Sequence, residues 1–102
     1  LPECKLYAAS KAALSSYSKV LASELAGQKI RSNCICPGII ITPMTNAAIE
    51  ASPEAMADGE KDYPLGYGEP KDVSSLAIYL LSDESRWMTG TDLILDGGLT
   101  LK

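Results

Sequence analysis

The order of three segments in the second half of the chain constrains its fold more than any other feature. A short apolar run at 30–36 ends at a Pro-Gly pair, and a second run at 90–96 ends at a Gly-Gly pair. Between them, residues 70–82 carry apolar side chains at helical spacing. A strand, a helix and a strand in this order predict a parallel pair joined by a right-handed crossover. Because parallel sheets need both faces covered, two strands indicate a part of a larger α/β sheet.

Two amphipathic helices are predicted around these strands. The first runs from Tyr7 to about Ala26, since this stretch lacks Pro and Gly, and Gly27 follows where a left-handed residue commonly ends a helix. Its apolar positions are Leu14, Tyr17, Leu21 and Leu25. The second begins with Pro70 at its first position. Its apolar face consists of Val73, Leu76, Ala77, Leu80 and Leu81.

Composition limits the classes of partner. The net charge is −4 and contains no Lys/Arg block, so we expect no nucleic-acid partner. No apolar run approaches the roughly 20 residues that span a bilayer, and the start at 1–5 lacks a signal-peptide core, so we expect neither membrane insertion nor secretion. There are three cysteines and no histidine. Cys34 and Cys36 fit small buried strand residues, and we expect no metal site.

The stretch from 42 to 69 mixes turn formers with acidic residues. Short helices are expected at about 46–51 and from the Ser-Pro pair at 52–53 onward, and we interpret the stretch as a mobile insertion. Gly66 and Gly68 do not begin a G-x-G-x-x-G turn, because position 71 is Lys. The turn that would hold a pyrophosphate is therefore expected upstream of this chain, or absent.

Tyr7 and Lys11 are four residues apart in uninterrupted helix, so their side chains lie about 40° apart around its axis. A cation beside a phenol favours the phenolate, which can exchange a proton with substrate. The spacing alone is weak evidence, because Tyr67 and Lys71 share it across a Gly and a Pro that interrupt any helix. The alternative for the first pair is a solvated pair on a helix surface.

Several stretches in one order resemble the short-chain dehydrogenase/reductase family, and most closely its 3-oxoacyl-[acyl-carrier-protein] reductase branch. The similarity covers nearly all 102 residues. The matching stretches are Y-A-A-S-K at 7–11 for the family's Y-x-x-x-K, R-S-N-C-I-C-P-G at 31–38 for R-x-N-x-x-x-P-G, Thr42 four residues after that glycine, P-L-G-Y-G-E-P-K-D-V at 64–73 before a helix, T-G-T at 89–91 and D-G-G at 96–98. One departure is that a single residue, Tyr67, separates two glycines where many members have Arg and another residue.

The resemblance implies a fold and a reaction. We expect residues 1–102 to be the C-terminal part of one Rossmann-like, doubly wound parallel-sheet domain whose nucleotide-binding N-terminal half is missing. Its expected parts are a catalytic helix (1–27), a strand (30–36), a cofactor loop and substrate lid (37–69), a helix (70–82) and a strand (90–96). The expected enzyme is an oxidoreductase that transfers hydride between NADP or NAD, with NADP preferred, and a ketone or secondary alcohol. The segment alone is expected to be inactive.

The resemblance also assigns roles to residues. Tyr7 would protonate the carbonyl oxygen in reduction and act as the base in the reverse direction, while Lys11 would stabilise the phenolate and bond the nicotinamide ribose. Ile40 would bond the carboxamide, and Thr42 the carboxamide or the phosphates. The implied cofactor-binding residues are Tyr7, Lys11, Pro37, Gly38, Ile40 and Thr42. The family's serine, and its usual asparagine, lie upstream and are not assigned.

Partners and alternatives follow from the same reading. We expect a small carbonyl or alcohol substrate, a cytoplasmic location with any targeting segment upstream, and a homodimer or homotetramer built through the first helix and through the last helix and strand. The alternatives are an alcohol, sugar or steroid dehydrogenase, or a truncated chain that acts only through subunit association. Five carboxylates make the lid a poor surface for an acidic carrier protein: Glu50, Glu54, Asp58, Glu60 and Asp62.

Overall fold

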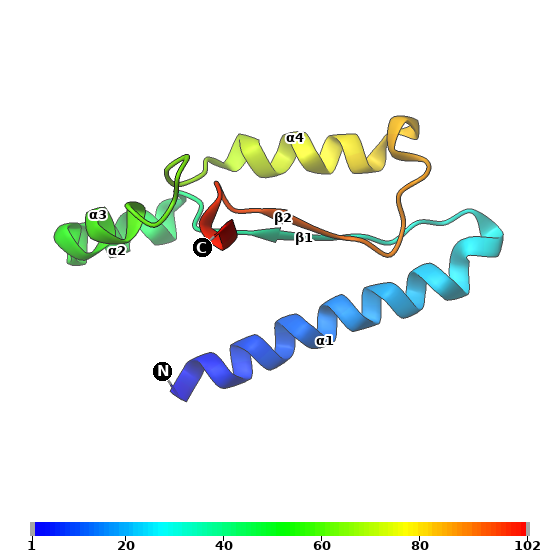
Figure 1. Cartoon of the computed structure of the whole chain (residues 1–102), viewed down its shortest axis with the longest axis horizontal. Helices are drawn as coiled ribbons and strands as arrows, with labels where there is room; N and C mark the ends of the chain where they lie inside the picture. Colours follow the sequence, from blue (N-terminus) through cyan, green and yellow to red (C-terminus); the bar gives the residue numbers. More distant parts are fainter. Residues whose placement is uncertain (1, 102) are drawn as a thin grey trace. The chain divides into compact units, whose positions relative to one another are not determined.

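The computed structural model describes residues 2–101, and the side chains of residues 5–101. Its helices and strands, drawn in Figure 1, are α1 (Pro2–Leu25), β1 (Cys34–Pro37), α2 (Pro43–Ala51), α3 (Pro53–Glu60), α4 (Pro70–Leu81) and β2 (Asp92–Leu95). Three short 3₁₀ turns lie at Ala26–Gln28, Asp83–Ser85 and Leu99–Leu101. Two compact units share these elements. Unit 1 contains the residues up to Cys34 with Leu80–Leu93, and unit 2 contains Ile35–Tyr79 with the residues from Ile94 onward.

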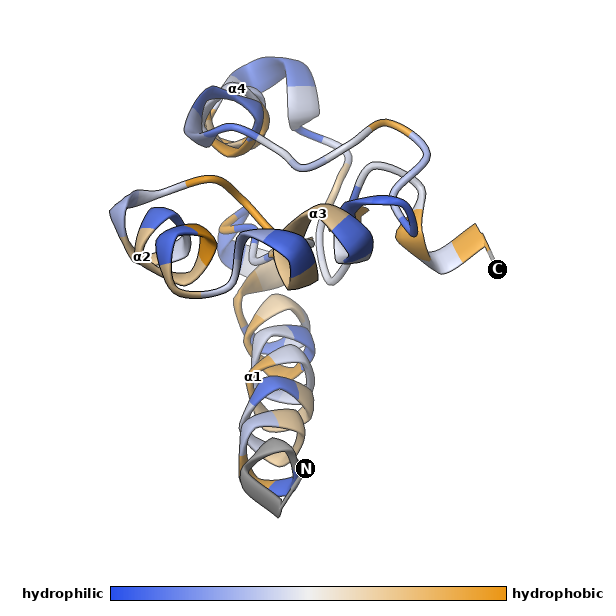
Figure 2. Ribbon diagram, turned by 90° about the vertical axis from the view of Figure 1, so that its left-hand side faces the viewer, coloured by the Kyte–Doolittle hydropathy of each residue, from blue (hydrophilic) through white to orange (hydrophobic). Residues whose placement is uncertain are grey.

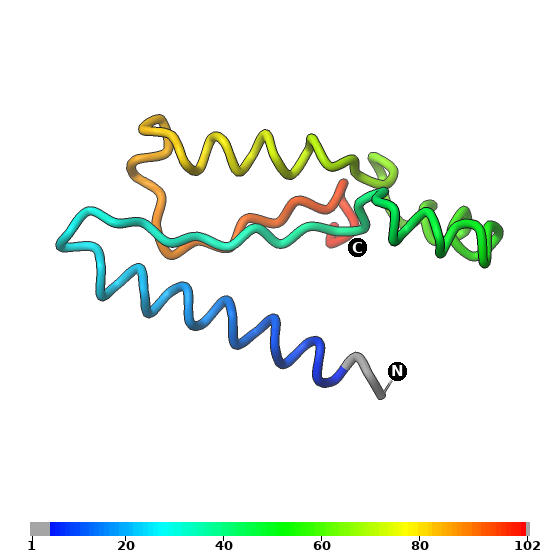
Figure 3. Tube along the Cα trace, turned by 180° about the vertical axis from the view of Figure 1, so that it is seen from behind, coloured from blue at the N-terminus to red at the C-terminus, as the bar shows by residue number. Residues whose placement is uncertain are grey.

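The two strands form a parallel pair, as the strand-helix-strand order predicts. The N–H of Cys34 donates to the Thr91 carbonyl at 2.9 Å, and the N–H of Gly38 donates to the Leu95 carbonyl at 2.9 Å. The offset between partners is the same at both ends, which is the pattern of a parallel ladder. Figure 3 follows both strands along the trace in the same direction.

β1 begins at Cys34, four residues later than predicted. The preceding residues bond to the loop before β2 instead of forming a ladder. The Ser32 carbonyl accepts from the Gly90 N–H at 2.7 Å, and the Ser32 N–H donates to the Thr89 hydroxyl at 3.2 Å. Side-chain bonds of this kind compete with strand pairing, so the apolar pattern at 30–36 overestimates the length of the strand.

The end of α1 also differs from the prediction. The left-handed residue is Lys29, with φ of 59°, and not Gly27, which lies in the 3₁₀ turn. The N–H of Lys29 donates to Ala26 and the N–H of Ile30 donates to Leu25. These two bonds close a Schellman motif two residues beyond the glycine, because one further 3₁₀ turn satisfies the last carbonyls first.

The inward face of α1 combines small residues with two of the four predicted apolar positions, because Ser18 and Ala22 are buried while Leu21 and Leu25 are half-buried. Within the described side chains, Ala22 is the only buried hydrophobic residue, at 4% exposure. A Cβ added at Gly90 would lie 3.5 Å from the Ala22 Cβ, so the helix approaches the loop before β2 closely. Leu14 and Tyr17, predicted on the apolar face, are exposed. Close approach at Gly90 requires a small partner, which the spacing of large apolar residues does not reveal.

In unit 2, α2 and α3 pack against each other as a pair of short helices, visible in green in Figure 3. α2 begins at Pro43, three residues earlier than predicted, because Thr42 caps it. Seen end-on in Figure 2, α4 is polar on one side and apolar on the other. Four of its five predicted apolar positions are half-buried, but Leu81 is exposed. Within residues 2–101, no helix combines the length and the apolar character that crossing a membrane requires.

Candidate active site

Tyr7 and Lys11 come together on α1 in unit 1. The Lys11 ammonium lies 5.3 Å from the centroid of the Tyr7 ring, within the range of a cation–π contact. Both side chains are exposed. The helix is regular from Pro2 to Leu25, so the four-residue spacing is realised as a contact and not only as a pattern.

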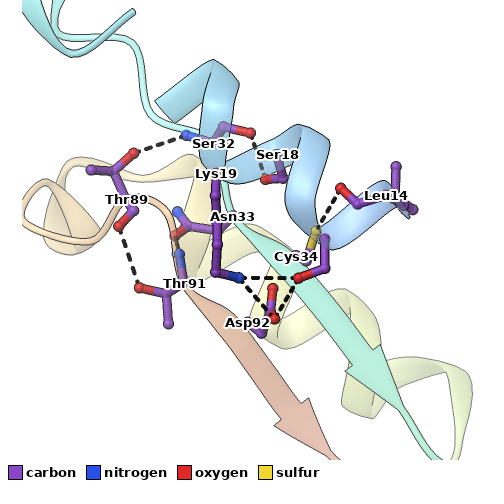
Figure 4. A network of polar contacts seen from close by, with 10 residues as sticks. Leu14, Ser18, Lys19, Ser32, Asn33, Cys34, Thr89, Thr91 and Asp92 are labelled. Carbon is purple, nitrogen blue, oxygen red and sulfur yellow. Dashed lines mark hydrogen bonds and ion pairs between the residues drawn. The ribbon is translucent and has the colours of Figure 1, made fainter. Parts of the chain in front are cut away.

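A polar network fixes α1 to the start of β2 within unit 1 (Figure 4). The Asp92 carboxylate accepts from the Ser15 hydroxyl at 2.6 Å and forms an ion pair with Lys19 at 2.9 Å. Lys19 also donates to Ser15 at 3.0 Å, which closes a triangle of three side chains. One turn further along the helix, the hydroxyls of Ser18 and Ser32 are 2.7 Å apart. These contacts fix the rotation of α1, and hence the side on which Tyr7 and Lys11 lie.

The Asp92 network makes a pH-dependent contribution to stability. The hydrogen bond from Ser15, and then the one from Lys19, hold the pKa of Asp92 below its ordinary value of 3.8. A carboxylate with a lowered folded-state pKa stabilises the fold above its unfolded pKa and loses that contribution as the pH falls through the folded value. We expect Asp92→Asn to be less stable than the parent at neutral pH and to converge with it below about pH 3.8. Urea unfolding across pH measures this, and a constant difference between the two proteins at every pH would contradict it.

The arginine and asparagine of the R-x-N stretch are structural in unit 1. The guanidinium of Arg31 donates to three backbone carbonyls, those of Leu80 (2.8 Å), Ser82 (3.2 Å) and Met88 (3.2 Å). The Asn33 amide donates to the Met88 carbonyl at 3.1 Å and accepts from the Thr91 N–H at 3.1 Å. A cation at the C-terminal end of α4 also interacts favourably with the negative end of the helix dipole. This motif therefore joins the approach to β1 with the end of α4.

The backbone just after β1 carries Gly38 and Ile40 in unit 2. A parallel bridge joins Ile40 to Gly68, in which the Gly68 N–H donates to Ile39 at 3.0 Å and the Ile41 N–H donates to Gly68 at 2.8 Å. The bridge does not use the N–H of Ile40. A Cβ added at Gly38 would lie 2.9 Å from the Tyr63 ring and 3.1 Å from Asp96, so the chain itself already fills the space that this glycine leaves.

Thr42 has a structural role at the start of α2. Its hydroxyl accepts from the Thr45 N–H at 3.4 Å, and its own N–H donates to the Thr45 hydroxyl at 2.5 Å, which is a reciprocal cap. The Thr45 hydroxyl also donates to the Ile40 carbonyl at 2.9 Å. The cap thereby ties the residues after β1 to the first turn of α2. The Thr42 and Thr45 hydroxyl oxygens are also 3.4 Å apart, and either hydroxyl can be the donor in that contact.

A cavity of about 340 Å³ lies in unit 2 beside these residues. Its lining includes Gly38, Ile40, Gly68, Asp72 and Ser75, together with the turn after β2. That turn is held internally, because the Asp96 carboxylate accepts from the N–H groups of Gly98 at 3.0 Å and Thr100 at 3.1 Å. The D-G-G stretch is thus a structural turn at the edge of the cavity.

The structure therefore places the six predicted site residues in two groups. Tyr7 and Lys11 belong to unit 1, while Pro37, Gly38, Ile40 and Thr42 follow one another along unit 2. Sequence reasoning missed Tyr63, whose hydroxyl accepts from the Ile39 N–H at 3.3 Å. It noted Tyr67 as a departure in spacing and as part of a Tyr–Lys pair that no helix aligns, and assigned it no role. The one available signal was that two aromatic residues stand four apart in a stretch otherwise rich in turn formers.

Comparison with known proteins extends these observations. A family model described as Enoyl-(Acyl carrier protein) reductase matches residues 1–100. The chain is 49% identical over 93% of its length to 3beta-hydroxysteroid dehydrogenase 1 of Eggerthella lenta, and 43% identical over 92% of its length to the 3-oxoacyl-[acyl-carrier-protein] reductase FabG of Chlamydia pneumoniae. It spans only 36% and 37% of the lengths of these two relatives.

Solved structures of similar proteins have the same fold. The structure of 4-hydroxyisoleucine dehydrogenase complexed with NADH is 37% identical and superposes with a TM-score of 0.86 over 94% of this chain and 40% of that one. The fold is thus a portion of the Rossmann-like α/β class. The chain belongs to the short-chain dehydrogenase/reductase family and corresponds to its C-terminal part.

Proposed function

We propose that this chain is part of an oxidoreductase that transfers hydride between a nicotinamide coenzyme and a ketone or secondary alcohol. The observation that carries the proposal is the contact of Lys11 with Tyr7 on an uninterrupted helix, at 5.3 Å, in a member of this family. The coenzyme would be NADP or NAD. NADH is the coenzyme named for the 4-hydroxyisoleucine dehydrogenase complex. The similarity of this chain to that protein supports a nicotinamide coenzyme, but it does not select between NADP and NAD.

The backbone after β1 fits a nicotinamide carboxamide. The N–H of Ile40 lies outside the bridge with Gly68, so it is free of that pairing and suits a carbonyl acceptor. The hydroxyl of Thr42 stands at the N-terminus of a nine-residue helix, where an anionic group is also favoured. No G-x-G-x-x-G turn is present in the sequence, so the pyrophosphate would be held by residues outside this chain.

The residues of this chain would hold and move a proton. When bound, a nicotinamide coenzyme would provide the hydride for the carbonyl carbon in reduction and would take it up from the alcohol in oxidation. The Tyr7 hydroxyl would donate its proton to the carbonyl oxygen during reduction and recover a proton during oxidation. The Lys11 ammonium would favour the phenolate by its positive charge. The network of Ser15, Lys19 and Asp92 would keep the helix in the rotation that presents the pair.

Two substrate classes have support from particular observations. The 43% identity to a 3-oxoacyl-[acyl-carrier-protein] reductase supports a 3-oxoacyl group. The 49% identity to a 3beta-hydroxysteroid dehydrogenase supports a free secondary alcohol. The five acidic side chains on α2, α3 and the turn after them favour the second, because all five are exposed. Asp58 forms an ion pair with Lys61 at 3.3 Å. That surface would repel an acidic carrier protein.

A substrate comparison tests the proposed reaction. The complete protein would be assayed by coenzyme absorbance with a 3-oxoacyl thioester carried on coenzyme A, the same group carried on acyl carrier protein, and a 3β-hydroxysteroid. We expect turnover with at least one of them, and a lower kcat/KM for the carrier-bound thioester than for the coenzyme A thioester. A protein that oxidises or reduces none of them, nor other simple alcohols, would favour the alternative of a chain that acts only through subunit association.

We further propose that the complete protein is a homodimer or homotetramer. Large exposed apolar side chains lie on α1 and on or near α4 and β2; they are Leu6, Leu14, Tyr17 and Val20 on α1, and Ile78, Leu81, Trp87 and Ile94 on or near α4 and β2. Such surfaces are typical of subunit interfaces. We expect sedimentation equilibrium to give the mass of at least two subunits at micromolar concentration. A strictly monomeric protein would show that these side chains are covered within one subunit.

A further inference from the structure

Tyr63 supports the backbone that follows β1 in unit 2. It lies in the turn after α3, and its hydroxyl accepts the Ile39 N–H at 3.3 Å. Its ring lies so close to Gly38 that an added Cβ would be 2.9 Å from the Cε2 atom. One side chain thus contacts two successive residues of the stretch to which the proposed function assigns the nicotinamide.

Tyr67 contacts Tyr63 and α3 at the same time. The two ring centroids are 5.0 Å apart with an angle of 71° between planes, which is an edge-to-face pair. The Tyr67 hydroxyl donates to the Met56 carbonyl in α3 at 2.7 Å, and its N–H donates to the Glu60 carboxylate at 3.1 Å. A Cβ added at Gly59 would lie 2.9 Å from the hydroxyl oxygen, so this oxygen rests directly on the helix backbone.

The state of the Tyr67 hydroxyl suits this contact. Desolvation by its surroundings, and then the charge of Glu60, raise the pKa of Tyr67 above its ordinary value of 10.0. Smaller effects of the same sign come from Tyr63 and Asp62. The hydroxyl therefore keeps its proton at neutral pH and can donate to the Met56 carbonyl.

We propose that Tyr63 and Tyr67 are positioning residues that couple the position of α3 to the backbone of residues 38–40. The contacts run without a break from the Met56 carbonyl through Tyr67 and Tyr63 to the Ile39 N–H. The next residue, Gly68, bonds Ile39 and Ile41 directly, so a shift of Tyr67 reaches this loop by the backbone as well. A substrate that moves α3 would thereby change the coenzyme contact, and this consequence rests on the proposed function.

Amide hydrogen exchange at Ile39, measured by NMR on the complete protein without coenzyme, tests the coupling. Tyr63→Phe removes the acceptor of the Ile39 N–H, and we expect exchange to accelerate about five-fold, the effect of one hydrogen bond of about 1 kcal/mol. Tyr67→Phe removes no bond to Ile39, yet it should accelerate the same amide by about three-fold or more, because α3 no longer holds the pair. The double variant should fall short of the product of the single effects. Tyr17→Phe, an exposed tyrosine on α1, is the control and should leave Ile39 unchanged.

Kinetics of the same variants give a second readout. We expect Tyr67→Phe to raise the coenzyme KM by about three-fold while kcat stays within about two-fold, since only the coenzyme-contacting backbone is disturbed. Unchanged Ile39 exchange in Tyr67→Phe, or fully multiplicative effects in the double variant, would overturn the coupling. Failure of the proposed function is a separate result, because it would appear as a parent protein without coenzyme-dependent turnover, whereas the exchange measurement needs no turnover.

Discussion

Tyr7→Phe is expected to lower kcat of the complete protein in the proposed reaction by about 10²- to 10⁴-fold and to leave coenzyme affinity nearly unchanged. The substitution removes the transferable proton and keeps the ring on which Lys11 lies at 5.3 Å. Because a general acid acts in the transition state, kcat and kcat/KM should fall together. Steady-state kinetics combined with a coenzyme titration by fluorescence would measure both quantities.

The control for this substitution lies on the same helix. Tyr17 is as exposed as Tyr7, at 63% each, and it stands away from the Lys11 contact. Tyr17→Phe should retain full activity. Lys11→Met should impair both rate and coenzyme binding, while Lys5→Met, an exposed lysine near the start of α1, should impair neither. Tyr7→Phe with most of its activity retained would remove Tyr7 from the mechanism.

Replacement of Arg31 by Ala is expected to cost about 3 kcal/mol of unfolding free energy. The guanidinium donates to the carbonyls of Leu80, Ser82 and Met88. A hydrogen bond from a charged donor contributes about 1.5–3 kcal/mol, and the contributions of three bonds from one side chain do not add in full. Arg31→Lys should recover only part of the loss, since one ammonium cannot match the planar donor geometry. Chemical denaturation of the complete protein measures these differences.

Arg86→Ala is the matched control, because Arg86 is exposed in the turn after α4. We expect a change within about 0.5 kcal/mol, as for most surface substitutions. An Arg31→Ala protein as stable as Arg86→Ala would mean that solvent replaces the guanidinium at little cost. The proposed structural role of the R-x-N stretch would then be wrong.

Periodicity was sufficient for the layout of the fold. The strand-helix-strand order predicted the parallel pair, and Pro70 with the apolar spacing after it predicted α4. Boundaries were less accurate where side chains compete for the backbone. Arg31 and Asn33 bond the loop before β2, so the strand begins only at Cys34. Hydrogen bonds from a side chain to a distant backbone leave no periodic trace in a sequence.

The candidate site shows the same difference between local patterns, which could be predicted, and distant contacts, which could not. Y-x-x-x-K is a local pattern on one helix, so it could be predicted, and the contact between Tyr7 and Lys11 exists in the structure. Tyr63 meets Gly38 and Ile39 only because the chain returns after α2 and α3, more than twenty residues later. Pairings of this kind depend on tertiary packing, and no spacing rule points to them. The roles of Tyr7, Lys11 and the residues after β1 in catalysis stay predictions.

Transfer of isotope from coenzyme to product is the most direct test of the central claim. The complete protein would be incubated with a ketone substrate and nicotinamide coenzyme deuterated at the transferable position, and the alcohol analysed by NMR. We expect deuterium on the carbinol carbon of the product, at a rate reduced by about 10²-fold or more in Tyr7→Phe. A product without deuterium, or one labelled equally fast by the Tyr7→Phe protein, would contradict the account.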